Sequence, residues 1–142
     1  MAVQIIKNPV IVLNGGTVSS SATQCSISVE WDNVDTTSFD SATAGWRTSI
    51  QGLGSGSFDV EWNQDYAAGG IDSIVWALAT AAAGTSSVVV RPASTAAAGS
   101  SNPQYSFSVV LTGWNPIDSA VGDLATVSTS WPITGVVTRA TA

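Results

Sequence analysis

The stretch GSGSFDVEWNQDYAAGGIDSIVWAL, residues 54–78, decides the fold class of this chain. Apolar and polar side chains alternate over Ser57–Asn63, which predicts a strand with one buried face and one solvent face. After the double glycine at 69–70 the apolar residues recur every three or four positions, which predicts a helix over Ile71–Ala82. The sequence therefore predicts a sheet with a polar outer face and one helix covering its other side.

The same alternation predicts further strands on both sides of this block. The clearest are long segments in which every second residue is apolar, and the others are short apolar runs that end at glycine or proline. The long segments are Gln24–Asp32, Tyr105–Thr112 and Ala125–Trp131, and the short ones are Val10–Leu13, Ser86–Arg91 and Val136–Thr138. We therefore expect a mainly β domain.

Length and charge limit the functions that this chain can have. Its 142 residues suit one domain spanning 1–142, and ten acidic residues against four basic ones give a net charge of -6. The bases Lys7, Arg47, Arg91 and Arg139 are far apart in sequence, which argues against tight nucleic-acid binding. A surface with few charges suits contacts between copies of the chain, because few charges are desolvated when such an interface forms. The alternative is a secreted Ser/Thr-rich β domain, and composition alone does not separate the two.

Residues that carry chemistry are scarce. The chain has no His, and its one Cys, Cys25, alternates in register with apolar residues, which predicts a small buried side chain. Asp59 and Glu61 are two residues apart on one strand face, which spaces their carboxylates about 7 Å apart. Two carboxylates at this separation could act as the catalytic pair of an inverting glycosidase. A solvated strand face is the better interpretation, so we expect no enzyme activity, no cofactor and no metal.

The N-terminus gives no targeting signal. Asn8 and Pro9 interrupt it before an apolar stretch of signal-peptide length develops, and the longest apolar run, Ile74–Ala79, is too short to span a bilayer. We expect folding in the cytoplasm and no membrane partner.

A long glycine-containing stretch, Asp40–Gly56, is predicted to be a loop. It carries Trp46 and Leu53, which disordered linkers rarely contain, so an arm that docks onto another surface is favoured over a locally packed Ω-loop. Three other tryptophans, Trp31, Trp62 and Trp131, end alternating strands on the apolar face, which indicates core or interface packing.

The ordered set of motifs resembles the tail tube (major tail) proteins of long-tailed bacteriophages, especially those that infect actinobacteria. The matching stretches run along most of the chain: Val10–Gly15, Asp35–Phe39, Gly52–Gly54, Phe58–Tyr66, Gly70–Asp72, Val75–Leu78, Val90–Pro92, Asn102–Tyr105, Gly122–Val127 and Trp131–Pro132. No single stretch is specific, and the resemblance lies in their order.

This resemblance implies a β-sandwich or partial barrel with one flanking helix, assembled as hexameric rings that stack into a tube. Four strands from each subunit would join a ring-closed barrel around a lumen through which genomic DNA passes during ejection. The arm at residues 1–9 and the extended loop at 35–56 would reach neighbouring subunits. The resemblance places the protein in the virion tail, assembled in the host cytoplasm, with other tail proteins at the tube ends and no small-molecule substrate.

Two sets of residues become expectations on this basis. If the four long alternating strands line the lumen, their polar faces carry Glu30, Asp32, Asp59 and Glu61 and no base, so that DNA slides without binding. Phe39, Trp46 and Leu53 would anchor the docking arm, with Arg47 paired to an acid of a neighbour. The alternatives are a minor tail or head-decoration protein and a carbohydrate-binding or adhesin β-sandwich.

Overall fold

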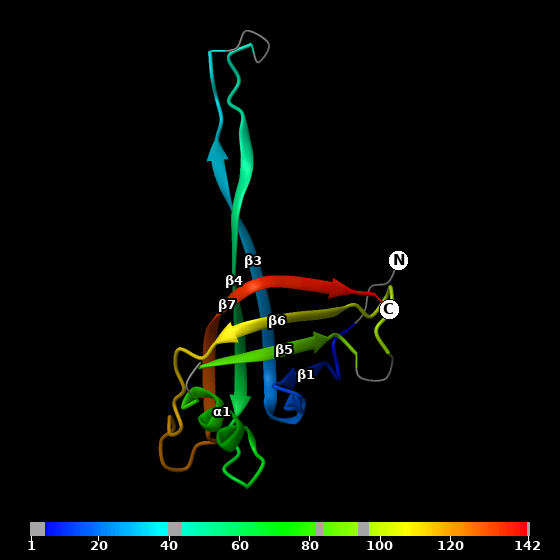
Figure 1. Cartoon of the computed structure of the whole chain (residues 1–142). Coiled ribbons are helices and arrows are strands. Elements are labelled where there is room, and N and C mark those ends of the chain that lie inside the picture. The colour runs from blue at the N-terminus through cyan, green and yellow to red at the C-terminus, as the bar shows by residue number, and fades with distance from the viewer. Residues whose placement is uncertain (1–4, 40–43, 82–83, 94–96, 142) are drawn as a thin grey trace.

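The computed structural model of the chain describes residues 5–39, 44–81, 84–93 and 97–141. One α-helix accompanies the strands in these ranges (Figure 1). In chain order the elements are β1 (Val10–Leu13), β2 (Gly16–Thr17), the 3-10 turn η1 (Ser19–Ser21), β3 (Ala22–Asp35), β4 (Ser49–Asn63), α1 (Ile71–Ala79), β5 (Thr85–Arg91), β6 (Gln104–Val110) and β7 (Thr126–Ala140). The prediction of a mainly β fold with one flanking helix is confirmed.

The strands form one antiparallel sheet in the order β2-β1-β5-β6-β7-β4-β3, which is not closed into a barrel within one subunit. Strand β7 folds this sheet into two layers. Its first half, up to Pro132, pairs with β4, and its second half, from Ile133, pairs with β6. Gly135, with φ of +87°, lies where the register with β6 shifts, and the extra residues there increase the bend. In Figure 1, β3 and β4 consequently run almost at right angles to β5 and β6.

The core lies between the two layers and is built by the predicted alternation. Phe58, Val60 and Trp62 of β4 are buried together with Trp131 of β7. Phe58 meets Phe107 of β6 edge to face, with ring centroids 5.3 Å apart. Each such side chain contributes on the order of 1.5–3 kcal/mol when it is removed from water, so this aromatic cluster is a main source of stability.

The helix closes one end of the space between the layers (Figure 1). Ile71 and Val75 are fully buried, and Ile74 and Leu78 pack at the margin of the core, as the helical spacing predicts. The helix ends at Ala79, and its predicted last residue, Ala82, lies outside the described residues.

The largest difference from prediction concerns the glycine-rich stretch. The sequence predicts a loop over Asp40–Gly56, but residues 49–56 of it form the first half of β4, paired with β3. A Cβ at Gly54 would lie 2.9 Å from Nε1 of Trp31, and one at Gly56 would lie 2.7 Å from the Ser28 carbonyl oxygen. These glycines therefore allow close approach of the two strands, which is why their number is not a sign of loop structure here.

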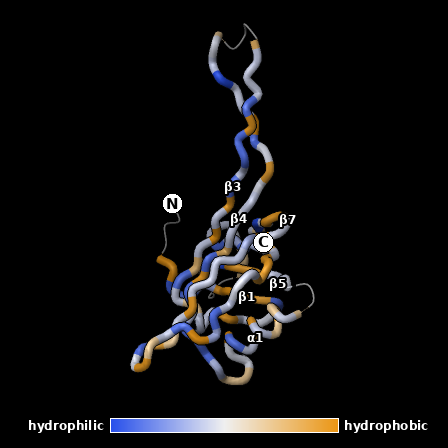
Figure 2. Tube along the Cα trace, turned by 90° about the vertical axis from the view of Figure 1, so that its left-hand side faces the viewer, coloured by the Kyte–Doolittle hydropathy of each residue, from blue (hydrophilic) through white to orange (hydrophobic). Residues whose placement is uncertain are grey.

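The β3–β4 hairpin is consequently long, and its outer part projects from the body (Figures 1 and 2). The segments predicted as separate strands at 125–131 and 136–138 are likewise one strand, β7. Pro132 did not end it because this residue lies at the junction where β7 leaves β4 and begins to pair with β6.

Candidate assembly surfaces

A polar face covers the outside of the layer formed by β3, β4 and the first half of β7. Strand pairing sets Asp59 between Ser26 and Ser130, and Glu61 between Gln24 and Ser128. Residues that are directly paired project to the same side of a sheet. The two acids of β4 therefore lie among hydroxyl and amide side chains, opposite the core residues of the same strand.

Glu30 and Asp32 extend this polar face along the hairpin. Glu30 pairs with Ser55, on the side that carries Asp59. The register shift that follows Trp31 leaves its extra residue on β4, so β3 keeps its alternation and Asp32 stays on the side of Glu30. The structure thus brings the four acids named from the sequence to one side of the β3–β4 ribbon. No Lys or Arg occurs in β3, β4 or the first half of β7.

The fourth predicted strand contributes to the other layer. Strand β6 pairs with β5 and with the second half of β7, where Ser106 lies opposite Thr138 and Ser108 opposite Thr134. The four long strands are consecutive in the sheet, in the order β6-β7-β4-β3. The bend in β7 nevertheless turns the hydroxyl side chains of β6 away from the acidic layer, which sequence periodicity does not indicate.

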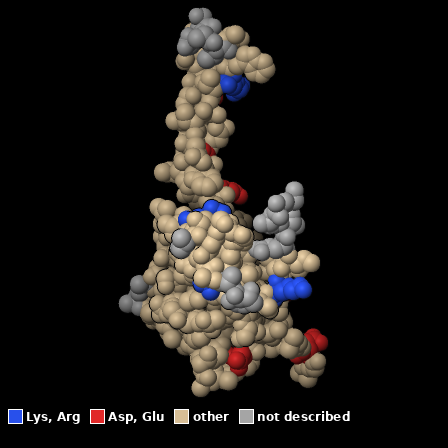
Figure 3. Space-filling model, turned by 90° about the vertical axis from the view of Figure 1, so that its right-hand side faces the viewer, with Lys and Arg blue, Asp and Glu red and all other residues tan. Residues whose placement is uncertain are grey.

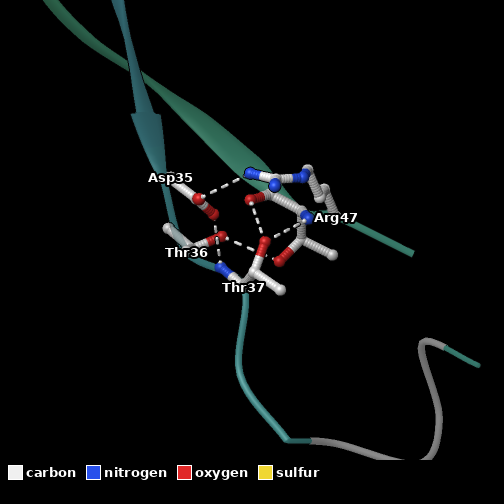
Figure 4. Close-up of polar contacts among 5 residues, drawn as sticks. Asp35, Thr36, Thr37 and Arg47 are labelled. Carbon is white, nitrogen blue, oxygen red and sulfur yellow. Dashed lines mark hydrogen bonds and ion pairs between the residues drawn. The ribbon is translucent and has the colours of Figure 1, made fainter. Parts of the chain in front are cut away.

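The outer end of the hairpin is held closed by polar contacts (Figure 4). The Thr37 backbone N–H donates to Oδ1 of Asp35 at 2.8 Å, and the Thr36 hydroxyl donates to the Thr48 hydroxyl at 3.1 Å. Hydrogen bonds from the Thr37 side chain and from its N–H lower the pKa of Asp35. Arg47 lies 3.7 Å from Asp35, so its ion-pair partner in this chain is an acid of its own hairpin.

The predicted arm residues are exposed on this hairpin. Phe39 and Trp46 lie beyond the ends of the strands, and Leu53 lies within β4. Relative exposures of 113% for Phe39, 78% for Trp46 and 81% for Leu53 show that none of them packs on its own body. Single exposed apolar residues are common on protein surfaces, but several on one projecting hairpin indicate a contact surface.

The acidic layer has two open edges. Strand β3 is the last strand of the sheet, and the first half of β7 pairs only with β4. Both edges therefore present backbone N–H and C=O groups that have no strand partner among the described residues. Edge strands of this length are normally covered or paired, which points to strand pairing with another subunit.

An apolar slot opens between the layers beside the β3 edge. It consists of two cavities of about 340 and 490 Å³ that share Ile27 and Tyr105. The larger cavity also contacts Trp31, which is 55% exposed, and Arg139. Trp31 is therefore not a core residue, unlike Trp62 and Trp131, and of the two uses predicted for it only an interface remains.

Cys25 lines the smaller cavity of the slot as a half-buried free thiol. Burial raises the pKa of its thiol from 9.0 to about 11, so the group stays neutral at physiological pH. No group of three or more His, Cys, Asp or Glu side chains in the described ranges is arranged to hold a metal ion. Likewise, none of the helices in those ranges is long and apolar enough to cross a membrane.

Solved structures with a similar fold include two chains from gene transfer agent particles. A chain from the virion of a native gene transfer agent particle superposes with a TM-score of 0.71 and 16% identity, covering 97% of this chain and 99% of that one. A chain from the tail of an empty gene transfer agent particle, refined with C6 symmetry, gives 0.69 and 17%, with the same coverage. The chain has the fold of these particle proteins. No family model and no curated protein matches the sequence.

The tail-type fold agrees with the resemblance seen in the sequence motifs. Because the match covers nearly the full length of both chains, it includes the two layers, the helix and the projecting hairpin. The sequence located the acids and the exposed hairpin residues. It did not indicate the slot, because Ile27 and Tyr105 occupy alternating positions like those of core residues. Only the structure shows that the two layers separate there and leave a cavity.

Proposed function

We propose that this protein is a tail tube protein, six copies of which form a ring and whose rings stack into the tube of a phage-type tail. The observation that carries this proposal is the match of almost the whole chain to a component of a tail with C6 symmetry. The role is structural, in the virion, and requires no catalytic group or cofactor.

The polar face suits the lining of a DNA conduit. Glu30, Asp32, Asp59 and Glu61 lie on one side of a layer that has no base, and the residues around them are mostly serine and threonine. Carboxylates repel the phosphate backbone, and hydroxyls contact it only weakly. In the proposed tube this face lines the lumen, and DNA passes along it during ejection without being retained.

The two open edges provide the means of closing a ring. Pairing the β3 edge of one subunit with the free first half of β7 in the next would join the acidic layers of neighbours into one continuous barrel. Closure removes every exposed edge of that layer, which also prevents uncontrolled aggregation.

The projecting hairpin provides the contact between rings. Strand pairing and the contacts at Asp35, Thr36 and Thr37 hold its two strands together, so little conformational entropy is lost when it docks. Phe39, Trp46 and Leu53 then bury their exposed surface on an adjacent ring, while other tail proteins cap the two ends of the tube.

Electron microscopy of the purified protein, combined with size-exclusion chromatography, tests this function. The proposal predicts rings with an open centre and tubes made of such rings. A protein that remains monomeric at high concentration and low salt contradicts it. Binding of that monomer to glycans would instead establish an adhesin, and its attachment to heads or tail tips would establish a decoration or minor tail protein.

A further inference from the structure

One loop of the described chain complements the slot in both charge and hydrophobicity. We infer that the loop at residues 117–124 of one copy docks into the apolar slot of the next copy around the ring. This inference rests on the proposed ring and specifies how neighbouring subunits recognise each other.

The loop exposes apolar side chains between acids. Ile117 is 81% exposed, Val121 106% and Leu124 71%, although all three are large apolar residues. Asp118 and Asp123 are exposed beside them. Three such apolar residues on one short loop are costly in water unless a partner covers them.

The loop is also held in shape before any partner binds. The backbone N–H of Asp123 donates to the carbonyl of Ala120 at 3.1 Å, closing a turn in which Gly122 has φ of +92°. The Ser119 hydroxyl accepts from the Thr126 N–H at 3.3 Å and ties the loop to the start of β7. A preformed loop loses little entropy on docking.

The slot has the opposite character at its rim. The chain has only four bases, and the slot is lined by three of them: Lys7 and Arg91 in the smaller cavity and Arg139 in the larger. The walls between them are apolar, including Ile27 and Val29. Figure 3, which looks at the side of the body where the chain termini lie, shows basic atoms across this surface.

The bases are poorly satisfied within the chain. Arg91 donates from Nη1 to Gln104 at a long 3.4 Å, and its buried Nε has no acceptor among the described residues. Within the described ranges, Arg139 donates to one side-chain acceptor, the Tyr105 hydroxyl, also at 3.4 Å. A carboxylate supplied by another copy would give these guanidinium groups the charged partner that they lack.

The positions of the two features agree with edge pairing. The loop leads directly into the first half of β7, the free edge on one side of the acidic layer, and the slot lies beside β3, the free edge on the other side. In Figure 1 the segment between β6 and β7 lies on the left, and the ends of β5 and β7 lie on the right. Joining the β7 edge to a neighbour's β3 edge therefore carries the loop toward that neighbour's slot.

A contact of this kind is heterologous, because each subunit gives its loop to one neighbour and its slot to the other. Such contacts generate closed rings when the rotation between subunits closes. The charge pairing would also disfavour loop-to-loop and slot-to-slot contacts, which bring like charges together.

Charge reversal on each side of the contact tests the inference. One variant carries Asp118→Lys and Asp123→Lys, and the other carries Lys7→Glu and Arg139→Glu; all four residues are exposed, so both variants should fold. Each variant alone sets like charges against each other, and its ring yield should fall about tenfold or more. Mixing the two restores opposite charges at every contact of an alternating six-membered ring, so rings should return in the mixture.

A control carries Trp76→Lys and Ala77→Lys on the exposed side of α1, which also adds two lysines but lies outside both the loop and the slot. It should form rings like the wild type. Full ring yield from either charge-reversed variant alone overturns the inference, and so does failure of the mixture while wild type and control form rings. If the wild type forms no rings, the proposed function itself fails. Circular dichroism identifies any variant that is misfolded, and the milder changes Asp→Asn and Arg→Gln at the same positions then replace it.

Discussion

The Ser130 hydroxyl donates a 2.5 Å hydrogen bond to Oδ1 of Asp59, across the pairing of β7 with β4. This bond fixes one carboxylate of the polar face, where Glu61 follows two residues later on the same side. The acids are thus part of an ordered, base-free surface that extends over three strands.

If this face lines the lumen of the proposed tube, placing bases on it should make the lumen bind DNA. In a variant with Asp59→Lys and Glu61→Lys, assembled tubes should retain short double-stranded DNA at low salt and release it as salt rises, because retention depends on phosphate contacts. The retained DNA should resist nuclease, because the tube wall encloses it.

The neutral variant Asp59→Asn with Glu61→Gln is the control. Its tubes should retain no DNA, since it adds no cation. DNA that binds the lysine variant but is completely digested by nuclease would place the acids on the outside of the tube.

Replacing Thr129 with Val should destabilise the fold. Nε1 of Trp62 donates to the Thr129 hydroxyl at 2.9 Å in the buried core, and that hydroxyl donates in turn to the Val60 carbonyl at 3.2 Å. Val fills the same space but leaves the indole N–H unpaired, at a cost of about 1–3 kcal/mol in the free energy of unfolding. Urea denaturation of the monomer measures this cost.

A double-mutant cycle isolates that hydrogen bond. Adding Trp62→Phe to Thr129→Val should cost less than the sum of the two single changes, because the unpaired N–H is then absent. Strict additivity would show that the bond contributes nothing specific.

Removing the tryptophan of the hairpin should impair stacking of rings. Trp46→Ala deletes a large side chain that is 78% exposed, so monomer stability should change little. If Trp46 anchors the hairpin on an adjacent ring, the loss is on the order of 2 kcal/mol per contact, and microscopy should show short tubes or free subunits. Trp76→Ala, on the exposed face of α1, is the matched control and should leave tube length unaltered.

The thiol of Cys25 should react slowly while the protein is folded. With a pKa raised from 9.0 to about 11, only about 0.1% of it is thiolate at pH 8, so alkylation by iodoacetamide should be about a hundredfold slower than in urea. Equal rates in both conditions would mean that the side of the slot holding Cys25 is open to solvent.

The same shift affects stability at high pH. The Cys25 thiol ionises near pH 9.0 in the unfolded chain but only near 11 in the folded protein. The free energy of unfolding is therefore unaffected by this group below pH 9 and falls as pH rises from 9 toward 11. A Cys25→Ala variant should therefore lose less stability between these two values than the wild type.

Much of this arrangement is visible in the sequence because burial imposes a period of two on a strand. Phe58, Val60 and Trp62 identify the inner face of β4, and Asp59 and Glu61 its outer face, without any structure. The helix likewise follows from the spacing of Ile71 and Val75. These features depend only on local chain geometry.

Features that depend on contacts distant in sequence are not visible. Gly54 and Gly56 look like loop residues, yet they are needed where β3 crowds β4, at Trp31 and Ser28. Trp31 occupies the alternating position of a core residue, but the layers have already separated at that point, so it is exposed. Both errors arise because the sequence shows which side a residue faces and not what lies there.

The most direct test of the central claim is a helical reconstruction of assembled tubes by cryo-electron microscopy at side-chain resolution. We predict six subunits per ring, with the carboxylates of Asp59 and Glu61 on the lumen wall and the β3 edge paired to the first half of a neighbour's β7. Rings in which these acids face the exterior, or a protein that forms no ring, would contradict the account.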